Sequence, residues 1–148
     1  MTAMTADILH ATGVVIDGRC VLLMGPSGVG KTDLALRLID RGAILLADDY
    51  VELRSERGKL SARAPQTIRG MIEVRGVGLV VVSNVEEACV ALIVDLGGEV
   101  DRLPDPKGRA LLGIMIPTVA LAGFEASAPI KVEAALRRFG LALQAALR

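Results

Sequence analysis

Eight consecutive residues match the pattern of a phosphate-binding loop, G-x-x-x-x-G-K-[ST]. They are Gly25-Pro26-Ser27-Gly28-Val29-Gly30-Lys31-Thr32. In such a loop the glycines let the backbone approach phosphate oxygens, the lysine reaches the β- and γ-phosphates, and the threonine hydroxyl can ligate Mg²⁺. An apolar run precedes the loop and a helical pattern follows it, which supplies the helix N-terminus that attracts an anion. The sequence therefore predicts a nucleotide or polyphosphate site.

Acidic residues at the ends of two apolar runs are candidates for the metal ligand and the base that phosphoryl transfer to a hydroxyl requires. The pair Asp48-Asp49 ends one run and Asp95 ends the other. The pattern alone favours neither position. The adjacent pair is the more suggestive arrangement, because one carboxylate can face the site while the other orients a partner. The single histidine, His10, has a side chain suited to handling protons near neutral pH.

A predicted hairpin positions the loop. Residues 14–16 and 19–24 are expected to be two strands joined by Asp17-Gly18, a dipeptide typical of tight hairpin turns. After the loop, apolar residues at helical spacing predict a helix over 32–40, with Gly42 as its C-terminal cap. The apolar run 43–47 is then expected to form a strand that presents Asp48-Asp49 at its end.

The rest of the chain predicts further strands and a closing helix. Strands are expected at 50–55, 59–62, 79–82, 88–94 and 111–116. The stretch 68–78, rich in glycine and charge, is expected to be a functional loop. Apolar residues at helical spacing predict a terminal helix over 130–148, with Gly140 as a weak or closely packed point. The expected class is α/β.

The composition fits one domain, residues 1–148, with an aliphatic core. The chain is 52% hydrophobic, and its aromatic residues are confined to Tyr50, Phe124 and Phe139. Cys20 and Cys89 lie within apolar runs, without the spacing of a metal site, and are expected to be buried free thiols.

The composition also argues against two classes of partner. Lysine plus arginine and aspartate plus glutamate both number 17, without a basic tract, so no nucleic-acid surface is expected. The first residues lack the pattern of a signal peptide, and no apolar run reaches the roughly 20 residues of a membrane span. We therefore expect a cytoplasmic protein that does not associate with membranes.

Several motifs in order resemble the catalytic domain of HPr kinase/phosphorylase, in the short form that lacks the family's N-terminal domain. The likeness starts at His10 and continues through the phosphate loop. It then takes in Leu45-Leu46-Ala47-Asp48-Asp49-Tyr50-Val51-Glu52 and Ile72-Glu73-Val74-Arg75-Gly76-Val77-Gly78. The resemblance implies an α/β P-loop kinase of the HPr kinase/PEP carboxykinase-like type, with a mixed central sheet and flanking helices.

The resemblance also implies an activity. The family's enzymes are ATP-dependent protein serine kinases that phosphorylate the phosphocarrier HPr, and that also remove the phosphate with inorganic phosphate, releasing pyrophosphate. Carried over to this chain, Asp48 would take the serine proton and Lys31 would hold the β- and γ-phosphates. Thr32 and Glu73 would hold Mg²⁺, and His10 would help bind or orient the phosphate. A homo-hexamer is implied as well.

The chain departs from the family pattern in two places. No arginine lies between residues 79 and 87, where longer members carry an arginine-bearing loop. The family's stretch of arginine and glycine before the last helix is replaced by Val119-Ala120-Leu121-Ala122-Gly123. Because the family links that stretch to phosphorolysis, these departures weaken the prediction of a phosphorylase more than that of a kinase.

Two alternatives remain open from the sequence. The loop is also similar to that of guanylate kinase, which would make the protein a nucleoside monophosphate kinase, although only Arg37 and Arg41 follow it closely. The second alternative is a nucleotide-binding regulator that transfers little phosphate, which the missing arginine loop would favour.

Overall fold

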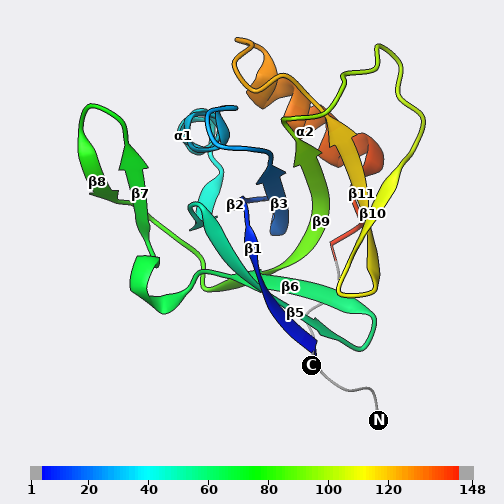
Figure 1. Cartoon of the computed structure of the whole chain (residues 1–148), viewed down its shortest axis with the longest axis horizontal. Helices are drawn as coiled ribbons and strands as arrows, with labels where there is room; N and C mark the ends of the chain where they lie inside the picture. Colours follow the sequence, from blue (N-terminus) through cyan, green and yellow to red (C-terminus); the bar gives the residue numbers. More distant parts are fainter. Residues whose placement is uncertain (1–4, 144–148) are drawn as a thin grey trace.

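The computed structural model describes residues 5–143 and shows a curled mixed sheet with two helices packed on one side (Figure 1). The strands of the main path are, in spatial order, β1 (Thr5–His10), β5 (Tyr50–Glu56), β6 (Lys59–Arg63), β9 (Glu87–Asp95), β3 (Arg19–Met24), β2 (Thr12–Ile16) and β4 (Ile44–Ala47). A hairpin of β10 (Gly108–Leu111) and β11 (Ile114–Ala120) joins this sheet because β11 runs parallel to β9.

The remaining elements lie around this sheet. β7 (Met71–Val74) and β8 (Gly78–Val81) form a separate two-stranded ribbon that projects beside α1 in Figure 1. The helices are α1 (Lys31–Asp40) and α2 (Ala128–Phe139), and a short 3₁₀ helix spans Gln66–Ile68. The mixed central sheet with flanking helices confirms the expected fold class.

The predicted hairpin before the phosphate loop is confirmed as β2 and β3, which pair antiparallel from Ile16 and Arg19 outward. Asp17 and Gly18 have φ angles of 51° and 76°, which suit the twist of a two-residue hairpin turn. β3 also runs parallel to β9, so it is held on both sides. The loop that follows β3 therefore starts from a fixed point in the middle of the sheet.

Strand β3 is apolar from Cys20 to Met24 because both faces of the curled sheet are covered there. Val21 and Leu23 pack with α1 and α2 in one hydrophobic cluster. Cys20 and Leu22 point the opposite way and pack in a second cluster that includes side chains of β5 and β6. This two-sided burial explains why the sequence shows a continuous apolar run rather than alternation.

Helix α1 buries Leu34 and Leu38 against the sheet, as its predicted apolar face requires. It ends where expected, because Gly42 has a φ of 112° and its N–H donates to the Ile39 carbonyl. Arg41 then joins α1 to α2 through Glu133, with Arg41 Nη2 lying 2.7 Å from Glu133 Oε1. Hydrogen bonding to that carboxylate raises the pKa of the Arg41 guanidinium.

Three stretches differ from their predicted structure. Strand β1 was not predicted at all. Residues 68–78 were predicted to form a functional loop, and this prediction was wrong, because the stretch contains β7 and the turn into β8. The expected strand 111–116 was also wrong, since Leu112 and Gly113, with φ angles of 49° and 78°, form the turn between β10 and β11.

The terminal helix is shorter than predicted. It ends at Gly140, which is extended with φ −61° and ψ 149°, so this glycine stops the helix rather than weakening its middle. The Leu141 N–H then donates to the Ala91 carbonyl and ties the chain to β9. The predicted helical segment 144–148 lies outside the described residues.

The two cysteines carry free thiols, as predicted. Cys20 is fully buried, whereas Cys89 is only half-buried. In the part of the chain that the structure describes, no helix has the length and apolar character needed to cross a membrane.

Candidate active site

The phosphate loop runs from the end of β3 to the start of α1 and has the backbone that its glycines predict. Gly25, Gly28 and Gly30 have φ angles of 144°, 89° and 95°, which other residues rarely adopt. Gly30 directly precedes the first turn of α1. The free N–H groups of that turn and the positive end of the helix dipole are therefore available to an anion.

Lys31 is buried although it is charged, with 7% of its surface exposed. Its Nζ donates to the Gly25 carbonyl over 2.6 Å and to the Pro26 carbonyl over 3.1 Å. These bonds satisfy an ammonium group that would otherwise be costly to bury. The same hydrogen bonds keep the charged Nζ of Lys31 against the phosphate loop, where the sequence predicts that the phosphates bind.

Asp48 lies next to the end of the phosphate loop and is 8% exposed. Its Oδ1 accepts hydrogen bonds from the Thr32 hydroxyl over 2.8 Å and from the Thr12 hydroxyl over 3.2 Å. Its Oδ2 accepts from the backbone N–H of Glu73 over 3.2 Å. Helix α1 and strands β2 and β7 thus fix one carboxylate beside the loop.

Thr12 is a site residue that the sequence analysis missed. It is fully buried in β2, and its hydroxyl both donates to Asp48 Oδ1 and accepts from the Asp49 N–H over 3.1 Å. One side chain therefore bridges the two neighbouring aspartates. No local motif marks Thr12, because only the pairing of β2 with β4 brings it to this place.

His10 and Asp49 form a second pair, which is exposed to solvent. His10 Nε2 lies 2.6 Å from Asp49 Oδ1, and the two side chains are 43% and 56% exposed. The Tyr50 ring packs on the imidazole, with 5.2 Å between ring centroids. Asp49 has a φ of 72°, which aspartate tolerates better than most residues, so its side chain contacts His10 while that of Asp48 contacts Thr32.

Glu73 reaches the site through its backbone. Its N–H donates to Asp48, while its side chain is exposed on the ribbon of β7 and β8. The structure thus brings Glu73 next to Asp48, and its carboxylate stays a predicted metal ligand.

Asp95, the rival carboxylate, lies at the end of β9 opposite Met24. Its Oδ1 accepts from the Gly97 N–H over 2.9 Å. A Cβ atom at Gly97 would lie only 2.9 Å from Pro26 Cδ, so this turn packs closely on the phosphate loop. Asp95 shapes that turn, whereas Asp48 contacts the loop threonine directly.

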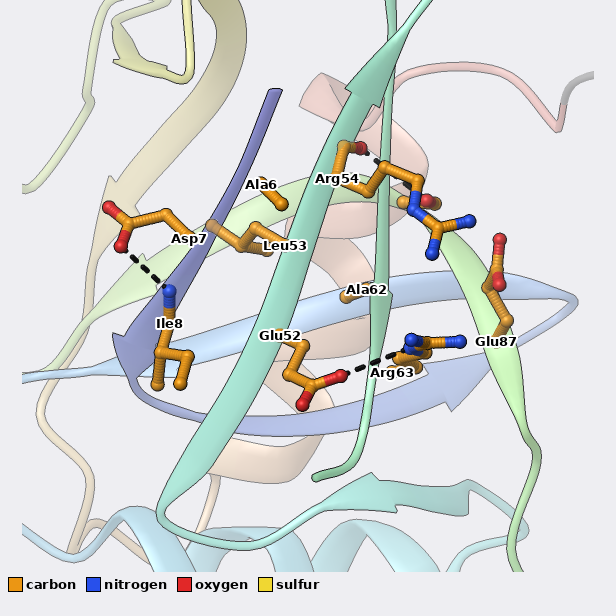
Figure 2. Close-up of a pocket in the computed structure, with 10 residues that line it drawn as sticks. Ala6, Asp7, Ile8, Glu52, Leu53, Arg54, Ala62, Arg63 and Glu87 are labelled. Atoms are coloured by element: carbon orange, nitrogen blue, oxygen red, sulfur yellow. Dashed lines mark hydrogen bonds and ion pairs between the residues drawn. The ribbon is translucent and has the colours of Figure 1, made fainter. Parts of the chain in front are cut away.

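A hollow of about 390 Å³ is lined by residues of β1, β5, β6 and β9 (Figure 2). Its charged side chains include the pair of Glu52 Oε1 and Arg63 Nε, 3.1 Å apart. None of the predicted site residues lines it. The candidate active site is therefore the surface around the phosphate loop.

The donors around Thr32 suit a magnesium ion that is bound together with phosphates. Within residues 5–143, no group of three or more histidine, cysteine, aspartate and glutamate side chains is placed to hold a metal alone. Mg²⁺ is usually held by one or two protein carboxylates together with substrate phosphates and water. Thr32 Oγ1 donates its proton to Asp48 Oδ1 over 2.8 Å, which leaves the lone pairs of Oγ1 for an ion, and the exposed Glu73 carboxylate belongs to a residue that contacts Asp48, so the residues fit that arrangement.

Comparison with known proteins assigns the chain to a family. Residues 2–122 match the family model described as HPr Serine kinase C-terminal domain. The chain belongs to this family. Its membership confirms the resemblance drawn from His10, the phosphate loop, Asp48-Asp49 and the Glu73 stretch.

The chain matches curated members of the HPr kinase family over part of their length. The HPr kinase/phosphorylase of Caldicellulosiruptor bescii is 40% identical over 126 residues, which cover 76% of this chain and 40% of that protein. The HPr kinase/phosphorylase of Brevibacillus brevis is 45% identical over 73 residues, covering 49% of this chain and 24% of that protein. The chain thus spans less than half the length of these relatives.

A solved structure shares the fold. The Hpr(Ser) kinase/phosphatase from Coxiella burnetii superimposes with a TM-score of 0.80 and 29% sequence identity, covering 89% of this chain and 95% of that chain. These relatives support the HPr kinase prediction and not the nucleoside monophosphate kinase alternative.

Proposed function

We propose that residues 1–148 act as one catalytic domain that transfers the γ-phosphoryl group of ATP to a serine of an HPr-like phosphocarrier. The observation that carries this proposal is the contact between Thr32 Oγ1 and Asp48 Oδ1, in a chain of the HPr kinase family. The contact puts a buried carboxylate at the end of the loop that would bind the phosphates. A base placed there is within reach of a hydroxyl group brought to the γ-phosphate.

In the proposed reaction the serine Oγ attacks the γ-phosphorus, the bond to the β–γ bridging oxygen breaks, and ADP leaves. Asp48 accepts the serine proton, and the Thr12 hydroxyl and the Glu73 N–H keep its carboxylate oriented. Lys31 and the N–H groups at the start of α1 hold the phosphates. His10, hydrogen-bonded to Asp49, orients the transferred group.

Magnesium is proposed to bind with the nucleotide, held by Thr32 and Glu73. When bound, it would neutralise negative charge on the β- and γ-phosphates.

Phosphorolysis of phosphorylated HPr is a second candidate activity, because the matched relatives are named HPr kinase/phosphorylase. In phosphorolysis an oxygen of inorganic phosphate attacks the phosphoserine phosphorus and passes its proton to Asp48, and the bond from phosphorus to the serine Oγ breaks. Asp48 gives that proton to the serine Oγ, and pyrophosphate leaves. We also propose that the protein forms a homo-hexamer, and this proposal rests on the family resemblance alone.

Incubation of the purified protein with γ-labelled ATP, Mg²⁺, an HPr protein and GMP tests the proposal. We expect label on HPr and none on GMP. Label on GMP with none on HPr would instead assign the protein to the nucleoside monophosphate kinases. Saturable ATP binding without label on either acceptor would favour the nucleotide-binding regulator.

A further inference from the structure

Phe124 is an exposed aromatic residue that lies against the phosphate loop. Its side chain is 67% exposed, in a chain that has one tyrosine, two phenylalanines and no tryptophan. A Cβ atom built on Gly30 would lie 3.0 Å from Phe124 Cε1 and 3.1 Å from Cζ. The ring therefore sits over the last glycine of the loop, with most of its surface open to solvent.

The backbone around Phe124 is fixed to α1 by one arginine. Arg37 donates to the Gly123 carbonyl and, over 2.9 Å, to the Glu125 carbonyl, so it holds the residues on both sides of Phe124. Arg37 is itself paired with Asp33 over 2.9 Å, one turn earlier in the helix. The ring thus occupies a set position although little of it is buried.

Close packing also joins this segment to the phosphate loop itself. A Cβ atom at Gly123 would lie 2.6 Å from the Val29 carbonyl oxygen, so only glycine fits there. The Leu121 N–H donates to the Asp95 carbonyl over 3.1 Å, which ties the same segment to the end of β9. An exposed ring on a rigid support is preorganised to bind a flat apolar group.

Asp48 and Phe124 contact two different residues at the start of α1. Asp48 contacts Thr32, and Phe124 lies over Gly30. In the proposed function the reacting phosphate lies beside Asp48. The nucleoside, at the other end of the nucleotide, would then be free to extend toward Phe124.

We propose that Phe124 is the platform on which the base of the bound nucleotide stacks. The inference rests on the proposed function, because it takes the phosphate loop as a nucleotide site. Every base has a π-face, so stacking on Phe124 adds affinity for the nucleoside without selecting adenine over guanine. Phe124 is thus a positioning residue for the nucleotide and not part of the phosphoryl-transfer chemistry.

Because the sequence contains no tryptophan, one introduced tryptophan would be the only source of indole fluorescence. Phe124→Trp introduces a single indole at the proposed platform, and Phe139→Trp introduces one at the end of α2, where Phe139 packs on the core. Both variants are titrated with MgATP and with magnesium tripolyphosphate, which lacks a base. We expect ATP, and not tripolyphosphate, to change the emission of the indole at position 124. Neither ligand should change the emission at position 139.

Calorimetric titration of wild type, Phe124→Ala and Phe124→Trp supplies the affinities. Removing the ring should weaken ATP binding about tenfold, leave tripolyphosphate binding unchanged, and be reversed by Phe124→Trp. Equal losses for both ligands would overturn the inference and make Phe124 a support of the loop. An unchanged ATP affinity in Phe124→Ala would overturn it as well.

The test of the stacking platform and the test of the kinase activity can fail independently. Wild-type protein that binds ATP more tightly than tripolyphosphate through Phe124, yet never phosphorylates HPr, would support the stacking platform and overturn the kinase. Phosphorylation of HPr, together with an unchanged ATP affinity in Phe124→Ala, would support the kinase and overturn the stacking platform. Wild-type protein that binds neither ligand would overturn both.

Discussion

The hydroxyl of Thr32 donates a hydrogen bond to Asp48 Oδ1 over 2.8 Å, so the last residue of the phosphate loop meets the first residue after β4. The two residues are 16 positions apart, and the rest of helix α1 and strand β4 lie between them. This contact joins a residue proposed to hold magnesium, Thr32, to the residue proposed to accept a proton, Asp48. The predictions below follow from it and from the side chains that support it.

Asp48→Asn should lower the rate of phosphoryl transfer to HPr by about 10²- to 10⁴-fold, because an amide cannot accept the serine proton. ATP affinity should change little, since Lys31 and the loop backbone are untouched. Transfer of label and calorimetric ATP titration measure the two effects. Loss of ATP binding in this variant would instead assign Asp48 to the nucleotide or its metal.

Thr12→Val should lower the free energy of unfolding by about 1–3 kcal/mol, because a buried hydroxyl that serves both aspartates is removed. Thr12→Ser keeps the hydroxyl and should recover most of the loss. Urea denaturation of both variants measures the difference. A valine variant that is at least as stable as the serine variant would contradict this prediction, because valine keeps the methyl group of Thr12 and loses only the hydroxyl.

His10 and Asp49 should act as a unit in phosphoryl transfer, since His10 Nε2 and Asp49 Oδ1 are 2.6 Å apart. The double variant of His10→Ala and Asp49→Ala should therefore be no slower than the more damaging single variant. The matched control is Arg63→Ala, which breaks the exposed pair with Glu52 on the same sheet and should leave transfer unchanged. Independent, additive losses at His10 and Asp49 would contradict the paired role.

Cys20 should make the protein less stable in alkali. Burial, with a smaller contribution from Cys89, raises the pKa of the Cys20 thiol far above its ordinary value. Above about pH 8.5 the unfolded chain loses the thiol proton and the folded protein keeps it, so stability falls as the pH rises.

The expected slope is up to about 1.4 kcal/mol per pH unit between about pH 8.5 and 10. Urea denaturation over that range measures it. Cys20→Ala should remove this contribution, and Cys89→Ala serves as the control that retains it. An unchanged slope in Cys20→Ala would show that other groups cause the alkaline loss.

Local signals in the sequence predicted the centre of the site. The Asp17-Gly18 turn, the glycines of the loop and the helical spacing after Thr32 each act within a few residues, so the hairpin, loop and helix followed from them. The end of the terminal helix was misplaced because Gly140 could be a weak point or a stop, and only the contact of Leu141 with Ala91 decides between them.

Features that depend on distant residues were not predictable in this way. Thr12 meets Asp48 across 36 positions of sequence, through strand pairing alone. Strand β1 lacks a regular apolar pattern and forms by pairing with β5. The turn between β10 and β11 uses Leu112 at a positive φ, a conformation that leucine rarely takes, so its sequence resembled a strand.

The most direct measurement of the central claim is the position of the phosphate on HPr after reaction with ATP, Mg²⁺ and this protein. Mass spectrometry of the acceptor locates it, with Asp48→Asn as the inactive control. We predict phosphate on one serine of HPr, absent with Asp48→Asn and absent when that serine is replaced by alanine. An HPr protein that stays unmodified, although the enzyme binds ATP, would contradict the proposed protein serine kinase.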